Sequence, residues 1–503
     1  MNRKLLFALC LSLGATAVAT HQSNAQRTTD LPSIEITRNP NATGGEWKLN
    51  LNAASMDRGN AWVDWNNNQK YEAGEEVSLW GMKSKDQTKH EVVQKTIRIY
   101  GNLSAFKCEA NEIVKIDASK HPSLAYLDCE DNQLESIDLS KNTKLMHINL
   151  AKNKLSDIQV AHLGAQLKHL DVGRNKLTAI DVMVHTNLDY LDCCHNEISK
   201  LDVTKNPKLE NLFCNHNQLK ELDVTQNKKL QWLWFFNNEI STLKMAEYKE
   251  GESVYDIDYL SAHHNKLEEM TISEKLYPKL QTCYLNNNRL SKFSIGDHQK
   301  LNNLNLSDNQ LTSVTLGSLP DLRMLSVHGN RLSGLSVAKC PLLKLIYTYE
   351  NEFPESVFQV AVKTLPSGTD KEPNAIYIID SKSKREGGEK NKITDDVVRA
   401  FNAKYWKVYD NKNGLSDGKN EIVVQTSLDE VRHGGDLFYF SSESRELVSE
   451  TDIVEIALYD LSGLLLATSH QLSTINSMLQ SGVGYIAIAR TADGKQLLCK
   501  FIR

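Results

Sequence analysis

The sequence predicts a solenoid with a parallel β-sheet on its concave face, a cap at each end and a β-sandwich at the C-terminus. Asparagine recurs in the middle of the chain in steps of mostly 21 residues, and leucines keep the same phase, as at Leu124, Leu127 and Leu134. This pattern is typical of a leucine-rich repeat. The asparagines of the series are Asn111, Asn132, Asn153, Asn175, Asn196, Asn217, Asn238, Asn265, Asn288, Asn309, Asn330 and Asn351.

A single repeat explains the shape of the predicted solenoid. Leu127 and Cys129 are two residues apart, so both face the core from a short strand, while residues 126, 128 and 130 face outward on the concave surface. The amide of Asn132 both donates and accepts, so it can satisfy backbone groups at the turn that follows the strand. Because 21 residues leave little room for a helix, we expect extended or 3₁₀ segments on the convex side. Stacked neighbours then create the core that one coil lacks.

Two repeats are longer than the rest. The step from Asn238 to Asn265 contains a charged stretch at residues 247–252, which we interpret as a convex insertion that the solenoid tolerates. The step from Asn265 to Asn288 carries two additional residues.

Composition limits the possible functions. The chain of 503 residues is too long for one ordinary core, but a solenoid has no such limit. With a net charge of −5 and no run rich in lysine or arginine, nucleic acid is not an expected partner. After the N-terminus no stretch of 18 apolar residues predicts a transmembrane helix. The sequence also lacks the common hydrolase, zinc-peptidase and P-loop motifs, so we do not expect an enzyme.

The first 25 residues predict an export signal. Arg3 and Lys4 precede the apolar stretch from Leu5 to Leu13. Ser23 to Ala25 form a cleavage site of small residues, which leaves Gln26 first.

The mature chain divides into four parts. We predict an N-terminal β-rich cap, a repeat region of about twelve units, a mixed α/β C-terminal cap and a β-sandwich domain, at residues 26–96, 97–353, 354–415 and 416–503. The expected elements outside the repeats are strands at Trp47–Leu51, Glu76–Trp80, Ala375–Ile379, Glu421–Val424, Ile453–Tyr459, Leu464–Ala467, Tyr485–Ala489 and Leu497–Ile502, and a helix at Thr394–Tyr405.

The repeat region resembles the internalin-like leucine-rich repeat surface proteins of bacteria. It is most similar to the internalin J type, because cysteine replaces leucine at a core position of the strand. Four cysteines at this position form an expected ladder of small buried side chains, at Cys108, Cys129, Cys193 and Cys214. We expect free thiols, because neighbouring Cβ atoms in parallel strands lie farther apart than a disulfide prefers. Zinc at Cys194 and His195 is disfavoured, since adjacent strand residues face opposite ways.

The tail resembles a type IX secretion C-terminal sorting domain of Bacteroidetes. The matching stretches are Leu458–Gly463, Leu479–Tyr485, Asp493–Lys495 and Lys500–Arg503. The family pattern places glycine two residues before tyrosine, so an additional residue separates Gly482 from Tyr485 unless it is Gly484 that takes the glycine role. The resemblance implies passage across the outer membrane, removal of the tail and attachment to surface lipopolysaccharide. The alternative is a further adhesive sandwich domain.

A group of aromatic residues is the strongest predicted binding site. Strand alternation places these side chains on the concave surface, and exposed aromatic patches often mark interaction sites. The predicted partner-binding residues are Tyr190, Phe213, Trp232, Trp234, Phe236, Tyr259 and Tyr284. The alternative is that these rings only cover the sheet or pack against another segment. Histidines on or beside this surface, from His147 to His328, either give pH-sensitive binding or are ordinary polar residues.

A loop near the N-terminus matches the spacing of an EF-hand calcium loop. The expected ligands are Asp64, Asn66, Asn68, the carbonyl of Lys70, Glu72 and Glu75. Ca²⁺ takes six to eight oxygen ligands, so this set suits a structural ion. Two features depart from the pattern: Gln69 stands where glycine is expected, and no helices flank the loop. An asparagine-rich turn without metal is the alternative.

These observations together predict a secreted, cell-surface adhesin. It would bind a protein or glycan on a host cell or a neighbouring bacterium, with a role in adhesion or biofilm formation. Two alternatives remain open: a structural envelope component that associates with itself, and an enzyme or a scaffold for a partner enzyme.

Overall fold

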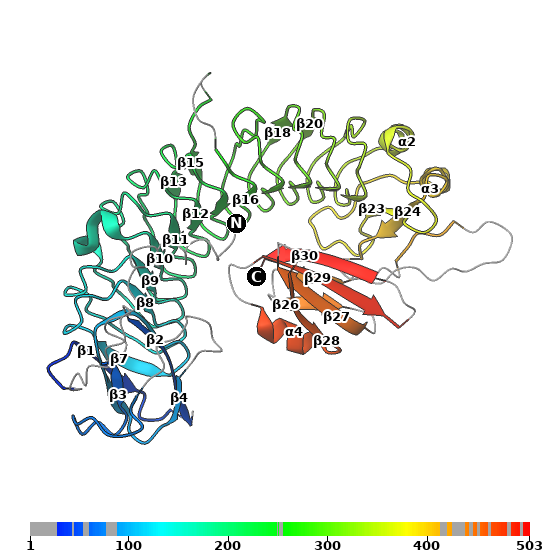
Figure 1. Ribbon diagram of the computed structural model, residues 1–503. Coiled ribbons are helices and arrows are strands. Elements are labelled where there is room, and N and C mark those ends of the chain that lie inside the picture. The colour runs from blue at the N-terminus through cyan, green and yellow to red at the C-terminus, as the bar shows by residue number, and fades with distance from the viewer. Residues whose placement is uncertain are drawn as a thin grey trace, which may run out of the picture.

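A computed structural model shows an arc-shaped solenoid followed by a smaller C-terminal unit (Figure 1). It describes residues 28–42, 45–53, 60–76, 88–248, 250, 255–412, 420–424, 438–441, 446–449, 453–460, 464–479, 484–492 and 496–502. The expected export signal lies outside these residues, as does most of the expected strand Glu76–Trp80.

A sheet of 16 strands lines the concave side of the arc. Neighbouring repeat strands pair in parallel and in register, so that Leu127, Ile148 and Leu170 align in the core. The repeat strands are β6 (Leu103–Lys107), β8 (Tyr126–Asp128), β9 (His147–Asn149), β10 (His169–Asp171), β11 (Tyr190–Asp192), β12 (Asn211–Phe213), β14 (Trp232–Trp234), β16 (Tyr259–Ser261), β17 (Thr282–Tyr284), β19 (Asn303–Asn305), β21 (Met324–Ser326) and β22 (Leu345–Tyr347). The predicted leucine-rich repeat solenoid is therefore confirmed.

The asparagines that recur once per repeat form a ladder, and their hydrogen bonds connect successive coils. The Nδ2 of Asn196 donates to the carbonyls of Val172 in the preceding coil (3.0 Å) and Cys193 in its own coil (3.1 Å). Its Oδ1 accepts the N–H of Leu177 at 2.9 Å. The residue before each ladder asparagine has a positive φ, such as 52° at His195, and this conformation turns the chain inward at the end of the strand.

The N-terminal cap combines two sheets. β3 (Trp62–Asp64), β5 (Thr96–Tyr100), β1 (Ser33–Arg38) and β7 (Ile113–Asp117) form an antiparallel sheet in that order. β2 (Glu46–Ala53) and β4 (Thr88–Glu91) add antiparallel strands to the edge of the long sheet, so the first coil is covered.

The long sheet also continues past the last leucine-rich coil. β23 (Asn374–Ile379) and β24 (Trp406–Asp410) extend it in parallel, beside the helices α2 (Glu355–Thr364) and α3 (Asp395–Asn402). Asn391 repeats the role of a ladder asparagine there, because its Nδ2 donates to Thr348 (2.9 Å) and its Oδ1 accepts the N–H of Phe353 (3.0 Å).

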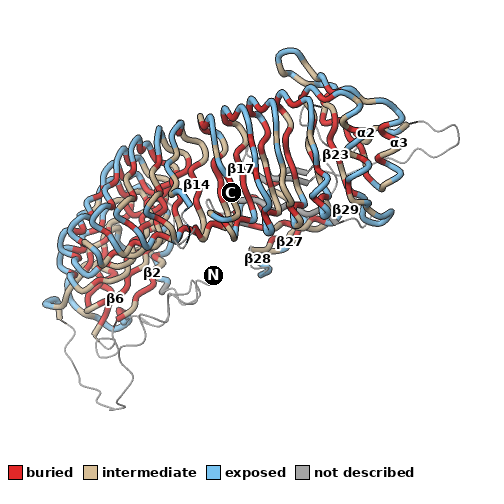
Figure 2. Tube along the Cα trace, turned by 90° about the horizontal axis from the view of Figure 1, so that it is seen from above, coloured by how far each residue is buried: buried red, intermediate tan, exposed pale blue. Residues whose placement is uncertain are grey.

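The convex side consists of extended and 3₁₀ segments, as predicted. It carries the 3₁₀ helix η2 (Ala161–Gln166) and two short parallel pairs, β13 (Glu221–Asp223) with β15 (Thr242–Lys244) and β18 (Lys292–Ile295) with β20 (Ser313–Leu316). Buried residues recur in every coil beneath this side (Figure 2).

The C-terminal unit has a core of its own. An antiparallel sheet contains β28 (Leu465–Ser469), β27 (Ile453–Asp460), β29 (Gly484–Thr491) and β30 (Gln496–Ile502) in that order. A hairpin of β25 (Phe438–Ser441) and β26 (Glu446–Ser449) and the helix α4 (Leu472–Met478) complete the unit. The expected strand Glu421–Val424 makes only one bridge among the described residues, from Glu421 to Tyr409.

Candidate partner-binding surface

Strand register arranges the concave side chains in rows that run along the solenoid. Two positions in each strand face the concave surface, so each position forms one row. Ring contacts connect residues of both rows into one chain of rings, which we call the ring row. Its members are Tyr126, His147, His169, Tyr190, Phe213, Trp232, Trp234, Tyr259 and Tyr284.

The N-terminal part of the ring row is a stack of parallel rings. The centroids of Tyr126 and His147 lie 4.0 Å apart, those of His147 and His169 3.9 Å, and those of His169 and Tyr190 4.0 Å. Their planes differ by 7° to 12°. The two histidines, which the sequence left as possible polar surface residues, are therefore part of an aromatic stack. Their shared phase with Tyr126 and Tyr190 is the sequence signal that predicts this.

The two tryptophans occupy the middle of the ring row. Trp232 and Trp234 stack with centroids 5.6 Å apart, on the face opposite to the buried Leu233. Trp234 contacts Phe213 at 4.4 Å, and Tyr259 follows at 5.8 Å. Tyr284 ends the row, 5.7 Å from Tyr259. Six of the seven residues predicted as partner-binding thus form one connected group.

Two of these residues are buried, although the sequence predicted an exposed patch. Trp234 is 0% exposed and Phe213 3%, so the expectation of an exposed side chain is wrong for both. The reason is close packing, since Trp234 has rings of Phe213, Trp232 and Tyr259 against it. The partly exposed members among the predicted residues are Tyr190, Trp232, Phe236, Tyr259 and Tyr284.

Phe236 belongs to a neighbouring group of rings with histidines. It stacks on His263 at 4.3 Å and meets His216 edge-on at 5.3 Å, and His216 in turn stacks on His195 at 4.1 Å. Burial, together with the nearby imidazoles of His264 and His216, lowers the pKa of His263 to about 3. His263 is thus neutral at physiological pH.

Carboxyl groups occupy the second concave position of the strands that carry His169 and Tyr190. Asp171 and Asp192 pair in register on β10 and β11. Burial raises the pKa of Asp192 to about 6, and burial together with the charge of Asp192 raises that of Asp171 well above its ordinary value. The N–H of Cys194 donates to Asp192 at 2.9 Å, and Cys194 itself is buried on this face. The cysteines whose side chains are described are free thiols: Cys108, Cys129, Cys193, Cys194, Cys214, Cys283 and Cys340.

A cluster of acids at the N-terminal end of the face is held by lysines. Glu109, Asp128 and Glu130 place carboxylate oxygens within 4.8 Å of one another. Lys107 lies 2.9 Å from Asp128, and Lys152 lies 2.9 Å from Glu130. These ammonium groups supply the positive charge that a metal ion would otherwise provide.

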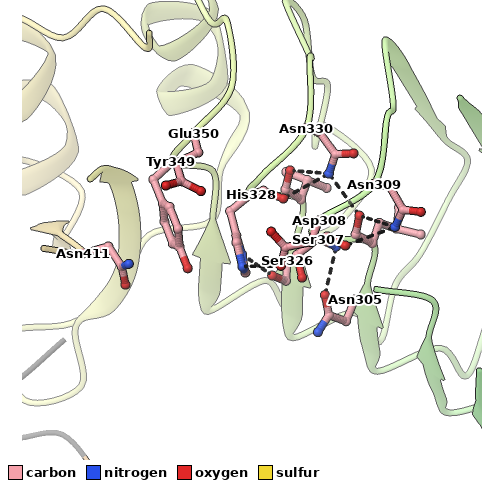
Figure 3. Close-up of polar contacts among 12 residues, drawn as sticks. Asn305, Ser307, Asp308, Asn309, Ser326, His328, Asn330, Tyr349, Glu350 and Asn411 are labelled. Atoms are coloured by element: carbon pink, nitrogen blue, oxygen red, sulfur yellow. Dashed lines mark hydrogen bonds and ion pairs between the residues drawn. The ribbon is translucent and has the colours of Figure 1, made fainter. Parts of the chain in front are cut away.

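The C-terminal end of the face is polar (Figure 3). His328 stacks on Tyr349 at 4.3 Å, lies 2.8 Å from the hydroxyl of Ser326 and forms an ion pair with Asp308 at 3.5 Å. Burial would raise the pKa of Asp308, but its interactions with His328, Arg385 and Ser307 together lower it. An open hollow of about 370 Å³ adjoins this pair, lined by Asp308, Asn309, Gly329, Glu350, Lys384 and Arg385.

The predicted calcium loop follows β3 in the N-terminal cap. Its six ligand positions are all described, at Asp64, Asn66, Asn68, Lys70, Glu72 and Glu75. Asp64 and Glu75 are buried, and the other four are partly or fully exposed.

Comparison with known proteins finds likenesses only among solved structures. No protein-family model and no curated protein matches the chain. Among solved structures, the functional domain of InlJ from Listeria monocytogenes, which includes a cysteine ladder, is 18% identical over 80% of this chain and 92% of its own, with a TM-score of 0.40. InlF from the same organism is 19% identical (49% and 81% covered, TM-score 0.38), and YopM from Yersinia pestis is 23% identical (52% and 62% covered, TM-score 0.34).

The helices in the described part of the chain give no candidate for a membrane span, since none is both long and apolar enough. The parallel strand register and the asparagine hydrogen bonds show a leucine-rich repeat solenoid. It is similar, at low identity, to internalins and other leucine-rich repeat proteins.

Proposed function

We propose that the protein is a secreted cell-surface adhesin that binds a protein or glycan partner through its concave face. The observation that carries this proposal is the ring row, which runs without a break over eight consecutive strands from β8 to β17. Leucine-rich solenoids present such extended concave surfaces to their partners.

The chemistry of the ring row suits recognition. Stacked aromatic and imidazole rings give a flat, amphipathic surface with polar edges, and large aromatic residues dominate the energetics of many interfaces. The rings stand on short strands fixed by the asparagine ladder on one side, so little conformational entropy is lost when a partner binds. Trp232 is the best anchor, because it is partly exposed and its ring stacks on the buried ring of Trp234.

The proposed location rests on the two ends of the chain. Residues 1–25 have the composition of an export signal, and the tail resembles a type IX sorting domain. The tail's separate core agrees with a unit that is removed without loss of the solenoid. Attachment to surface lipopolysaccharide would then leave the concave face available for adhesion to host cells or within a biofilm.

A binding survey with the mature chain tests this proposal. Labelled protein beginning at Gln26 is applied to epithelial cells, immobilised matrix proteins, a glycan array and the producing bacterium, while analytical ultracentrifugation measures self-association. We expect saturable binding to one of these targets by a chain that stays monomeric. Self-association without any heterologous target would instead favour the structural envelope component.

A further inference from the structure

The loop from Asp64 to Glu75 in the N-terminal cap has the backbone geometry of a calcium loop. Asp64 Oδ1 accepts the N–H of Asn68 at 3.0 Å, and its Oδ2 accepts the N–H of Gln69 at 2.8 Å. Asn68 Oδ1 accepts the N–H of Lys70 at 2.8 Å. These bonds wrap the chain around the first ligand position. The Nδ2 groups of Asn66 and Asn68 donate to the carboxylate of Glu72 at 2.9 and 2.8 Å, which brings the third, fifth and ninth loop positions together.

Gln69 does not obstruct this geometry. Its φ is +60°, so it adopts the left-handed conformation that glycine usually provides at the sixth position of such a loop. The departure from the sequence pattern is thus one of residue type and not of backbone shape.

Glu75 carries a buried oxygen without a partner. The residue is 4% exposed, and its Oε2 accepts the N–H of Glu72 at 2.8 Å, whereas its Oε1 has no hydrogen-bond partner in the described structure. A buried carboxylate oxygen of this kind needs an explanation such as an ion. Glu75 also stands at the twelfth position, where calcium loops place a bidentate glutamate.

The loop gathers three carboxylates that have no ion-pair partner among the described residues. The carboxylates of Asp64 and Glu72 are the charged groups near the buried carboxylate of Glu75. Within the described residues, no lysine or arginine forms an ion pair with any of the three. This is the opposite of the acid cluster on the concave face, where Lys107 and Lys152 supply the positive charge.

We propose that this loop binds one Ca²⁺ ion and that the ion fixes the N-terminal cap. Its ligands are the side chains of Asp64, Asn66, Asn68, Glu72 and Glu75 and the carbonyl of Lys70. The set offers seven oxygens when Glu75 binds through both of its own, which lies within the range that Ca²⁺ takes. Oxygens that already accept a hydrogen bond keep a second lone pair for the ion.

Calcium binding by the full chain tests the proposal. Protein prepared in EDTA and dialysed is titrated with CaCl₂ by isothermal calorimetry, and its melting temperature is measured with CaCl₂, MgCl₂ or EDTA. We expect one site with a dissociation constant of about 1 mM or tighter, as in extracellular modules, and a higher melting temperature in Ca²⁺ than in EDTA.

Matched variants locate the site. Glu75→Gln removes the charge and should weaken Ca²⁺ binding at least tenfold. Glu75→Asp keeps the charge but shortens the reach, so it should also weaken Ca²⁺ binding. It is the second test variant in case Glu75→Gln fails to fold. Glu130→Gln, in the lysine-held acid cluster, should bind as the wild type does. The proposal is overturned if the wild type binds no Ca²⁺ at 5 mM, if both Glu75 variants bind normally, or if only Glu130→Gln loses binding.

Discussion

At the scale of single residues, the ladder asparagines do most to determine the fold. Each ladder amide lies between two coils, and its three to five hydrogen bonds satisfy backbone groups that would otherwise be buried and unpaired. This explains why the repeat period is visible in asparagine more clearly than in leucine, since isoleucine, valine or cysteine can replace a buried leucine.

Replacing one ladder asparagine should therefore destabilise the solenoid. Asn196→Ala leaves the carbonyls of Val172 and Cys193 and the N–H of Leu177 without their partner, so we expect a loss of roughly 2–4 kcal/mol in the free energy of unfolding. Urea titration followed by circular dichroism measures it. Asn211→Ala, on the concave face, is the control and should change stability by less than about 1 kcal/mol. Equal effects of both changes would contradict the role assigned to the ladder.

The buried carboxyl of Asp192 gives stability a pH dependence with a definite sign. Its pKa is about 6 in the folded chain against an ordinary value of 3.8, so the folded state binds the proton more tightly than the unfolded state. Its contribution to stability is present at low pH and is lost as pH rises through 6. We expect Asp192→Asn to stabilise the protein by about 1–3 kcal/mol at pH 8 and by little at pH 4.

Asp202→Asn is a control of opposite sign for the same titration. Hydrogen bonds from the side chain and backbone of Thr204 lower the pKa of Asp202, so its contribution is present above its unfolded pKa and is lost on acidification. This variant should be less stable than the wild type at pH 8. Denaturant titrations at pH 4, 6 and 8 compare the two variants, and a pH-independent effect of Asp192→Asn would rule out the assigned cause.

At the scale of elements, strand β14 carries one tryptophan that packs in the structure and one that is available for binding. Trp234 is fully buried, so Trp234→Ala should lower the free energy of unfolding by roughly 3–5 kcal/mol. Trp232 is partly exposed, so Trp232→Ala should lower it by only about 1–2 kcal/mol. Thermal and chemical denaturation measure both variants. Similar stability losses would show that the two rings have the same role.

The same elements show what the sequence can and cannot predict. Alternation along a strand correctly placed Leu233 in the core and both tryptophans on the opposite face, because it depends only on backbone geometry. It did not predict that Trp234 would be buried, because that depends on the sizes of side chains on the neighbouring strands. Asn391 was also missed, since α2 and β23 lie between it and Asn351 and break the period.

At the scale of the whole molecule, the solenoid and the tail have separate cores. One continuous cluster of buried residues runs from Ile34 to Val408, whereas the tail has a small cluster that includes Leu447, Ile456 and Tyr485. We therefore expect two transitions in differential scanning calorimetry, with the smaller one from the tail. A chain ending at residue 424 should lose only the smaller transition. A lower melting temperature of the remaining transition would indicate that the tail stabilises the solenoid.

Binding by variants of the ring row tests the central claim most directly. Trp232→Ala and Tyr190→Ala remove partly exposed rings, and Tyr248→Ala removes a ring that is 43% exposed on the convex insertion, as a matched control. Each purified chain is titrated onto the target identified in the binding survey by surface plasmon resonance. We predict at least a tenfold weaker affinity for the Trp232 and Tyr190 variants, with unchanged circular dichroism, and wild-type affinity for the Tyr248 variant. Wild-type affinity in both concave variants would contradict the claim that the ring row contacts the partner.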